Sequence, residues 1–240
     1  MKLVPLGDQA VLAYLADEAS AVRFAATVRA ANPSWLQDVV PAYGSVGVFF
    51  DADQINTANV IAWLQASGVA SAPREVASRG ADATPLAKVI PVCYEMAPDM
   101  PRVCEHTGLT SDDIIRLHTS TDFAIYAIGF VPGFPYMGYL PPELCGVGRL
   151  PSPRVRVEPG SVGLTGRQTG IYPLPRPGGW NLIGRTPLVI VDVAAGFFPL
   201  RVGDAVRFTR IDAAEFKRLE GERLALSPVA GLETPARQPQ

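Results

Sequence analysis

Apolar and polar residues alternate in the first 80 residues in a pattern that repeats once. Each half has two short alternating runs around a Gly-containing turn, followed by a segment with apolar residues at helical spacing. The pattern predicts strands at 2–6, 10–15, 36–41 and 46–50, and helices at 18–30 and 53–66. We therefore expect a small α+β domain over residues 1–80. The stretch 71–85 is poor in large apolar residues, which suits a linker.

The next part of the chain combines one strand with two short helices. The pattern predicts them at 88–93, 99–106 and 110–118. Thr110 and Asp113 form a capping pair at the start of the second helix. Two helices around a glycine turn also occur in DNA-binding proteins, but two aspartates open this second helix and Arg116 is its one firm cation. We therefore interpret the helix pair as structural.

From residue 119 onwards, short apolar runs separated by Gly and Pro are typical of a β-barrel or sandwich. Strands are expected at 123–129, 154–157, 161–165, 180–185, 188–193 and 205–209. A final helix is predicted over 212–224, with Asp212 and Glu215 as its capping pair. The expected domains are residues 1–80 and 81–212, followed by a C-terminal helix and tail over 213–240. We expect the polar tail from residue 227 to be mobile.

Composition narrows the classes of partner. The 21 lysines and arginines nearly balance the 23 aspartates and glutamates, so neither nucleic acid nor an anionic membrane is an expected partner. The three cysteines are odd in number and lack metal-ligand spacing, which argues against disulfides and against a zinc site. Neither a signal peptide nor a membrane span is recognisable. We expect a soluble, cytoplasmic protein without a metal site.

Gly, Pro and aromatic residues concentrate in residues 126–192, which predicts tight loops between short strands. Binding sites are usually built on loops of this kind. The aromatic residues of this stretch either wall an apolar pocket or pack the loops, and the candidates are Phe130, Phe134, Tyr136, Tyr139 and Trp180. We also expect a cis peptide bond between Phe134 and Pro135.

Three ordered motifs carry a resemblance to a known family. They are GFVPGFPYMGYLP, PSPRVRVEPGSVGLTGRQTGIYP and PGGWNLIGRTP. In this order and spacing they resemble the family of 5-oxoprolinase B subunits, also called allophanate hydrolase subunit 1, which includes a sporulation kinase inhibitor. The resemblance covers residues 1–210. One departure is that the sequence after Cys93 and Tyr94 lacks the glycine pair that many members carry.

The resemblance implies a fold, partners and an activity. The implied fold class is α+β, with a small N-terminal α+β domain followed by a cyclophilin-like β-barrel domain. The implied partners are the A and C subunits of 5-oxoprolinase, of which the C chain is a cyclophilin-like paralogue. The three together open 5-oxo-L-proline to L-glutamate with ATP, and this chain alone is then expected to be inactive. ATP binding by this chain stays open, because its Gly-rich segment lacks the GxxxxGK[ST] phosphate loop.

Opening an unstrained lactam requires an activated carbonyl, a cation for the substrate carboxylate and a group for proton transfer. The arginines Arg154, Arg156, Arg167 and Arg185 are available as cations, or as residues that brace loops. His118 is available as a base, or as a helix-end residue. Our candidate catalytic residues are His118, Arg154, Gln168 and Arg185, and our candidate substrate-binding residues are Phe130, Pro132, Phe134, Thr169, Tyr172 and Trp180.

Alternative functions stay open at the level of sequence. The first is a protein-binding inhibitor of a sporulation-type histidine kinase. The second is a subunit that processes allophanate or another urea-derived amide. Prolyl isomerisation, by analogy with cyclophilins, is a third, and it rests on the fold alone.

Overall fold

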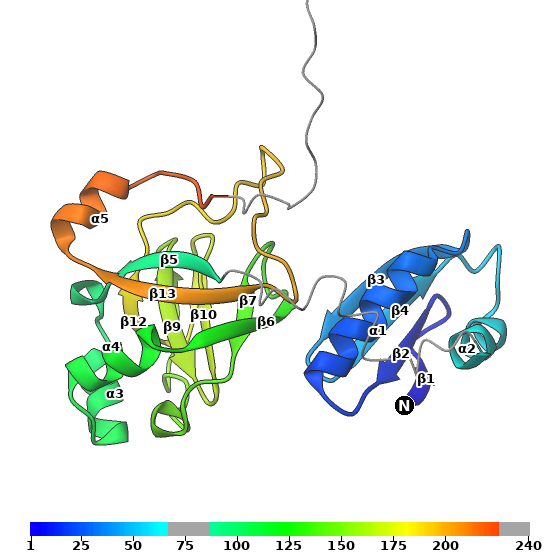
Figure 1. The fold of residues 1–240 in the computed structure, drawn as a ribbon, viewed down its shortest axis with the longest axis horizontal. Helices are drawn as coiled ribbons and strands as arrows, with labels where there is room; N and C mark the ends of the chain where they lie inside the picture. Colours follow the sequence, from blue (N-terminus) through cyan, green and yellow to red (C-terminus); the bar gives the residue numbers. More distant parts are fainter. Residues whose placement is uncertain (67–86, 226–240) are drawn as a thin grey trace, which may run out of the picture.

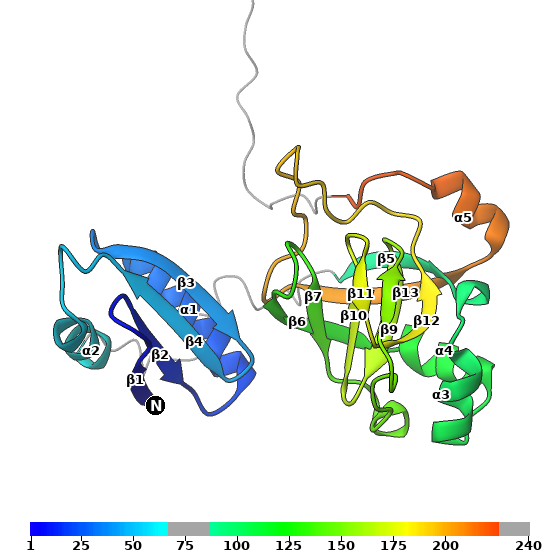
Figure 2. The same ribbon diagram turned by 180° about the vertical axis from the view of Figure 1, so that it is seen from behind.

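In the computed structural model, which describes residues 1–66 and 87–225, the N-terminal strands pair into an antiparallel sheet in the order β1-β2-β4-β3. The elements are β1 (Lys2–Pro5), β2 (Ala10–Tyr14), α1 (Glu18–Ala31), β3 (Leu36–Ala42), β4 (Ser45–Phe50) and α2 (Thr57–Ala66). Helix α1 lies along one face of the sheet (Figures 1 and 2). The expected repeat of two strands and a helix is confirmed. The predicted linker at 71–85 and the predicted tail from 227 lie outside the described residues.

Local hydrogen bonds decide where the two N-terminal helices begin. The Asp17 carboxylate caps α1 by accepting from the backbone N–H of Ser20 at 2.6 Å. The Asn56 side chain accepts from the backbone N–H of Asn59 at 2.9 Å in the same way. Because Asn56 takes this capping position, α2 starts at Thr57 and the prediction that it starts at residue 53 is wrong. Valines of the sheet and apolar residues of α1, such as Phe24, are buried together in one core.

Residues 87–225 contain a closed barrel with the strand order β10-β7-β6-β13-β5-β12-β9. Its strands are β5 (Lys88–Cys93), β6 (Asp122–Ile128), β7 (Pro135–Gly138), β9 (Ser161–Thr165), β10 (Gln168–Ile171), β12 (Asn181–Arg185) and β13 (Ala205–Ile211). β8 (Arg154–Val157) and β11 (Arg176–Gly178) form a separate two-stranded sheet. Closure removes exposed strand edges from the barrel. The expected α+β fold, with a small N-terminal domain before a barrel, is confirmed.

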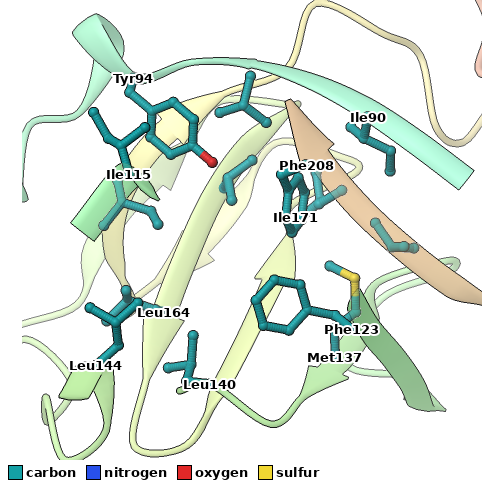
Figure 3. Packing of buried hydrophobic residues seen from close by; sticks show 14 of the residues in the cluster. Ile90, Tyr94, Ile115, Phe123, Met137, Leu140, Leu144, Leu164, Ile171 and Phe208 are labelled. Carbon is teal, nitrogen blue, oxygen red and sulfur yellow. The ribbon is translucent and has the colours of Figure 1, made fainter. Parts of the chain in front are cut away.

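The barrel interior is filled by side chains from strands that are distant in the sequence. Figure 3 shows Leu164, Ile171 and Met137, from β9, β10 and β7, directed into the same space as aromatic rings from β6 and β13. The period-2 alternation of β9 sends Val162 and Leu164 inward. The same alternation turns Gly163, which lies between them, to the outer face of the barrel, and this orientation matters for the site described below.

Helices α3 (Met100–Thr107) and α4 (Ser111–Thr119) lie against the barrel (Figure 1). The predicted capping pair is confirmed, because Thr110 Oγ1 accepts from the backbone N–H of Asp113 at 3.2 Å. α4 packs against β13 and buries Ile114, Ile115 and His118 in the barrel core. The helix pair therefore serves packing, as interpreted from its charges. Short 3₁₀ turns at Tyr94–Met96 and Pro142–Leu144 complete this part of the chain.

The structure corrects four predictions in the C-terminal half. Residues 188–193 do not form a strand, since they make only single backbone pairings through Val189 and Asp192. The last helix, α5 (Ala213–Leu219), is capped by Asp212 as predicted but stops well before residue 224. Strands β7, β10 and β11 were absent from the prediction. The cis peptide bond of the described residues is Gly138–Tyr139, and the bond before Pro135 is trans.

Candidate functional site

An aromatic pocket of about 200 Å³ lies on the outer surface of the barrel. Its lining comes from the loop before β7, the strands β7 and β11, and the segments that follow β10 and precede β8 and β12. The lining residues are Phe130, Phe134, Tyr136, Arg149, Pro153, Tyr172, Pro177, Gly178, Gly179 and Trp180. Several of them also belong to a small apolar cluster separate from the barrel interior. A concave apolar site with few polar groups is the usual form of a small-molecule pocket.

Phe134 holds the aromatic walls of the pocket together. Its ring makes edge contacts with four others, at centroid distances of 5.7 Å to Phe130, 4.9 Å to Tyr136, 5.2 Å to Tyr172 and 5.4 Å to Trp180. Phe134 is almost completely buried, whereas Phe130 is 60% exposed and stands at the edge of the pocket. The predicted pocket residues Phe130, Phe134, Tyr136, Tyr172 and Trp180 therefore come together, whereas Tyr139 lies outside the lining. Pro132 is exposed and lies outside the lining.

Glycines make room for these rings. A Cβ atom at Gly170, on the outer face of β10, would lie 3.0 Å from both the Phe134 and the Trp180 rings. A Cβ atom at Gly163 of β9 would lie 3.2 Å from the Trp180 Cβ. At Gly178 it would lie 2.4 Å from the Tyr172 hydroxyl oxygen. The Gly-rich motif that spans β9 and β10 is therefore a hairpin whose outer face accepts aromatic rings.

Arg149 is the cation of the pocket, and our reasoning from sequence missed it. It lies in an irregular segment held by two hydrogen bonds, from Asn181 Nδ2 to the Gly148 carbonyl at 2.9 Å and from the Leu150 N–H to the Gly179 carbonyl at 2.7 Å. Its guanidinium forms no hydrogen bond or ion pair with the residues that the structure describes. The one sequence signal was its place between Gly148 and the Pro-rich motif. Arg149 is therefore available to bind an anion.

The Arg149 charge acts on the two tyrosines of the pocket. Burial raises the pKa of Tyr136 and of Tyr172, and the positive charge of Arg149 opposes the rise in both. Both hydroxyls stay protonated at neutral pH, so each remains a hydrogen-bond donor. The pocket thus combines apolar walls, one guanidinium and two phenolic donors.

The four predicted arginines all lie outside the pocket lining. Arg154 forms an ion pair with the buried Asp99 at 2.6 Å. Arg185 donates to the Pro159 carbonyl at 2.9 Å, and its guanidinium lies 5.6 Å from the ring centre of Phe216. The last two are Arg156, which pairs with Glu158 at 2.7 Å, and Arg167, which lies 4.3 Å above the Tyr139 ring. These contacts match the bracing roles considered from the sequence.

His118 and Thr169 meet inside the barrel and not in the pocket. Thr169 Oγ1 donates to the Gly163 carbonyl at 3.1 Å, so its lone pair accepts from His118 Nε2 at 3.0 Å. His118 Nδ1 then accepts from the Tyr94 hydroxyl at 2.7 Å. This chain of donors fixes a neutral imidazole, which also stacks on Phe208 at a centroid distance of 4.5 Å. The catalytic role expected for His118, and the substrate contact expected for Thr169, are therefore not part of our proposal.

Acid should destabilise the barrel through His118. Complete burial lowers the pKa of His118 from 6.5 to about 3. Below pH 6.5 the unfolded chain therefore binds a proton at His118, whereas the folded chain does not bind it until the pH approaches 3. The contribution of neutral His118 to the unfolding free energy is complete above pH 6.5 and is lost progressively as the pH falls from 6.5 towards 3. Between pH 6 and 4.5 the wild type should lose about 2 kcal/mol more unfolding free energy than His118→Gln. Urea denaturation at both pH values measures this difference, and equal losses in the two proteins would contradict the prediction.

Gln168 lies on the outer side of β10, on the same face as Gly170, but outside the pocket lining. Alternation along β10 places Thr169 inside the barrel and Gln168 outside it. Its neighbour there is Tyr43 of the N-terminal domain. Gln168 is absent from the pocket lining. The expected catalytic set of His118, Arg154, Gln168 and Arg185 is thus dispersed over four locations.

Comparisons with known proteins place the chain in a family. The family model for the carboxyltransferase domain, subdomain C and D, matches residues 1–196. The 5-oxoprolinase B subunit of Bacillus subtilis (strain 168) is 34% identical over 200 residues, which are 77% of this chain and 80% of that protein. This chain belongs to the family of 5-oxoprolinase B subunits. The resemblance drawn from the three sequence motifs is thereby confirmed.

Two further comparisons describe other members and neighbours. The 5-oxoprolinase B subunit of Escherichia coli O157:H7 is 48% identical over 122 residues, which are 50% of this chain and 56% of that protein. The crystal structure of TTHA0988 shares the fold, with a TM-score of 0.71 and 32% identity over 85% of this chain. The chain spans only 40% of TTHA0988.

Two further observations concern possible metal sites and membrane-spanning helices in the described residues. Among residues 1–66 and 87–225, no three His, Cys, Asp or Glu side chains are grouped as metal ligands would be. In the same residues, no helix has the length and apolar character needed to cross a bilayer.

Proposed function

We propose that this chain is the B subunit of an ATP-dependent 5-oxoprolinase, which opens 5-oxo-L-proline to L-glutamate together with the A and C subunits. Family membership supports a role in the 5-oxoprolinase system, as one part of an enzyme and not as an enzyme alone. The aromatic pocket, with an Arg149 that has no partner among residues 1–66 and 87–225, is the observation that supports substrate recognition by this chain. The partner chains and the reaction are parts of the proposal.

The pocket matches the chemistry of a small lactam that carries a carboxylate. The rings of Phe134, Trp180 and Tyr172 offer apolar surface to the ring carbons of 5-oxoproline. The guanidinium of Arg149 is suited to bind the carboxylate, because two of its N–H groups match the two carboxylate oxygens. The hydroxyls of Tyr136 and Tyr172 are donors for the lactam oxygen, which gains negative charge as the amide bond is attacked. In this proposal the chain binds and orients the lactam and excludes water from its ring.

The Gly-rich segment, for which the sequence left ATP binding open, is not arranged as a phosphate site in the part of the chain that the structure describes. ATP activates an amide by phosphorylating its oxygen, which makes the carbonyl carbon electrophilic. The Gly-rich segment from Gly160 to Gly170 forms the β9–β10 hairpin, in which Gly163 packs against the Trp180 Cβ atom and Gly170 against the rings of Phe134 and Trp180. The described residues therefore do not fit a phosphate cradle there. We assign nucleotide binding to another part of the complex.

Reconstitution with the partner chains tests this proposal. The chain is co-purified with the C subunit of its own organism, and the A subunit is added with ATP and 5-oxo-L-proline. We expect a stable pair of the B and C chains, and glutamate release only when all three are present. If the B and C chains form a stable pair but no glutamate is released from 5-oxoproline with the A chain and ATP, the proposed substrate is wrong and a urea-derived amide is favoured. Failure to form the pair would overturn the proposed role in the complex and favour the kinase inhibitor.

A further inference from the structure

One aromatic side chain of the N-terminal domain is packed against the barrel. Tyr43 begins the two-residue turn between β3 and β4, where Ala42 pairs with Ser45. Its backbone N–H donates to the Tyr126 carbonyl of β6 at 3.2 Å. Its ring centroid lies 6.4 Å from that of Tyr126 and 6.4 Å from that of Tyr136. The tip of this hairpin therefore reaches two strands of the barrel.

The backbone of Tyr43 is unusual for an aromatic residue. Its φ angle is +52°, in the left-handed region. Tight hairpin turns place Gly, Asn or Asp at such positions, because a large side chain there is strained. Residues kept in strained conformations concentrate at functional sites, where the surrounding contacts hold them. The ring of Tyr43, rather than the shape of its turn, therefore explains why tyrosine occupies this position.

The Tyr136 ring stands between Tyr43 and the pocket. Tyr136 lines the pocket, and its centroid lies 4.9 Å from that of Phe134 and 5.8 Å from that of Trp180. It is also the pocket tyrosine that Tyr43 contacts. Moving or removing the Tyr43 ring opens space behind Tyr136, and an aromatic ring with space behind it no longer has one fixed position. Tyr43 itself does not line the pocket.

We propose that Tyr43 is a positioning residue, through which the N-terminal domain sets the Tyr136 wall of the lactam pocket. The inference rests on the proposed function for its substrate, but its geometry is independent of that substrate. The N-terminal domain then contributes to ligand recognition without touching the ligand. Its hairpin tip holds one wall of a pocket that belongs to the barrel.

The ring of Tyr43, and not its hydroxyl, makes the contact with Tyr136. Its oxygen is buried beside the Gln168 side chain, which is close enough to lower the pKa of Tyr43 but does not reach it with ordinary hydrogen-bond geometry. Removing the oxygen therefore leaves the contact with Tyr136 intact, whereas removing the ring abolishes it. This difference separates Tyr43→Phe from Tyr43→Asn. Asn also tolerates the left-handed backbone, so the second variant preserves the turn.

Steady-state kinetics of the complex reconstituted from all three chains give the first test. Tyr43→Asn should raise KM for 5-oxo-L-proline about 10-fold and change kcat less than about twofold. Tyr43→Phe should match the wild type. Tyr14→Asn is the matched control, because Tyr14 is 46% exposed on the same sheet. A wild-type KM in Tyr43→Asn, or an equal rise in the control, would overturn the proposal.

Fluorine NMR gives a second test that needs no substrate. The chain has three tryptophans, Trp35, Trp63 and Trp180, so labelling with 5-fluorotryptophan gives three resonances. We expect Tyr43→Asn to shift the Trp180 resonance, identified with Trp180→Phe, and to leave Trp35 and Trp63 unchanged. An unshifted Trp180 would refute the positioning role. If the wild-type complex does not open 5-oxoproline, the proposed function fails and this spectrum alone decides the role of Tyr43. If Tyr43→Asn does not fold, Tyr43→Leu is measured in the same way.

Discussion

Replacing Arg149 with Ala should lower kcat/KM of the reconstituted complex for 5-oxo-L-proline by about 100-fold. A charge-assisted pair of hydrogen bonds to a carboxylate contributes about 1.5–3 kcal/mol, and the Arg149 guanidinium has no other partner among the described residues. The barrel should fold as before, because Arg149 is exposed and forms neither a hydrogen bond nor an ion pair within the described part of the chain. The measurement is the initial rate of glutamate release at substrate concentrations well below KM.

Two companion variants make this result specific. Arg149→Lys keeps the charge but loses the bidentate geometry, so its loss should be intermediate. Arg116→Ala is the matched control, since Arg116 is an exposed arginine on α4 and is absent from the pocket lining. If the kcat/KM of Arg149→Ala is within about twofold of wild type, Arg149 does not bind the substrate carboxylate. An equal loss in Arg116→Ala would show a general effect of charge.

The second large effect is expected for Asp99→Ala, on stability. The buried Asp99 carboxylate accepts from Arg154 at 2.6 Å and from the Leu182 backbone N–H at 2.7 Å. Removing it leaves a partly buried guanidinium and a backbone donor without partners. Loss of one member of a buried pair costs about 3–5 kcal/mol, and the partial exposure of Arg154 brings the expected loss to about 3 kcal/mol. Scanning calorimetry of the barrel transition measures it.

A pair of similar charge on the surface provides the control for Asp99. Asp112 pairs with Arg210 at 3.2 Å, but its side chain is 86% exposed. Asp112→Ala should therefore change the unfolding free energy by less than about 0.5 kcal/mol. Equal effects of the two substitutions would show that burial does not decide the strength of the Asp99 pair.

The Asp99 pair also lies next to the pocket. Arg154 is opposite Gly178 in the β8–β11 sheet, and Gly178 lines the pocket. We therefore expect Asp99→Ala to weaken substrate binding as well.

Most of the fold could be predicted from the sequence, because its signals are local. Strands such as β8 and β9 follow from short runs of β-branched residues closed by Gly or Pro, and the Thr110 cap follows from its spacing to Asp113. Strand β10 was missed because Gln168–Ile171 has a single large apolar residue, Ile171, beside a glycine, and so shows no alternating apolar run. That glycine, Gly170, leaves room for the Phe134 and Trp180 rings on the outer face of the barrel. Residues 188–193 had a strand pattern, but the neighbouring strands of the barrel were already paired to one another.

The site was only half predictable, for a different physical reason. Its aromatic residues stand out by their density, and five of the six predicted ones line the pocket. The choice among arginines depends on which of them already has a partner, and those partners come from distant segments. Arg154 has Asp99, 55 residues away in the sequence, whereas Arg149 has none among the described residues. His118 likewise meets Thr169 only through closure of the barrel.

The most direct test of the pocket compares two ligands on two proteins. Calorimetry of the reconstituted complex without ATP gives Kd for 5-oxo-L-proline and for 2-pyrrolidinone, which is the same lactam without its carboxylate. We expect the wild type to prefer 5-oxo-L-proline by about 30-fold or more, and the Arg149→Ala complex to prefer it by less than about threefold. Loss of this preference in Arg149→Ala would show that Arg149 binds the carboxylate of 5-oxo-L-proline. An unchanged preference in Arg149→Ala would contradict the account and place the substrate elsewhere in the complex.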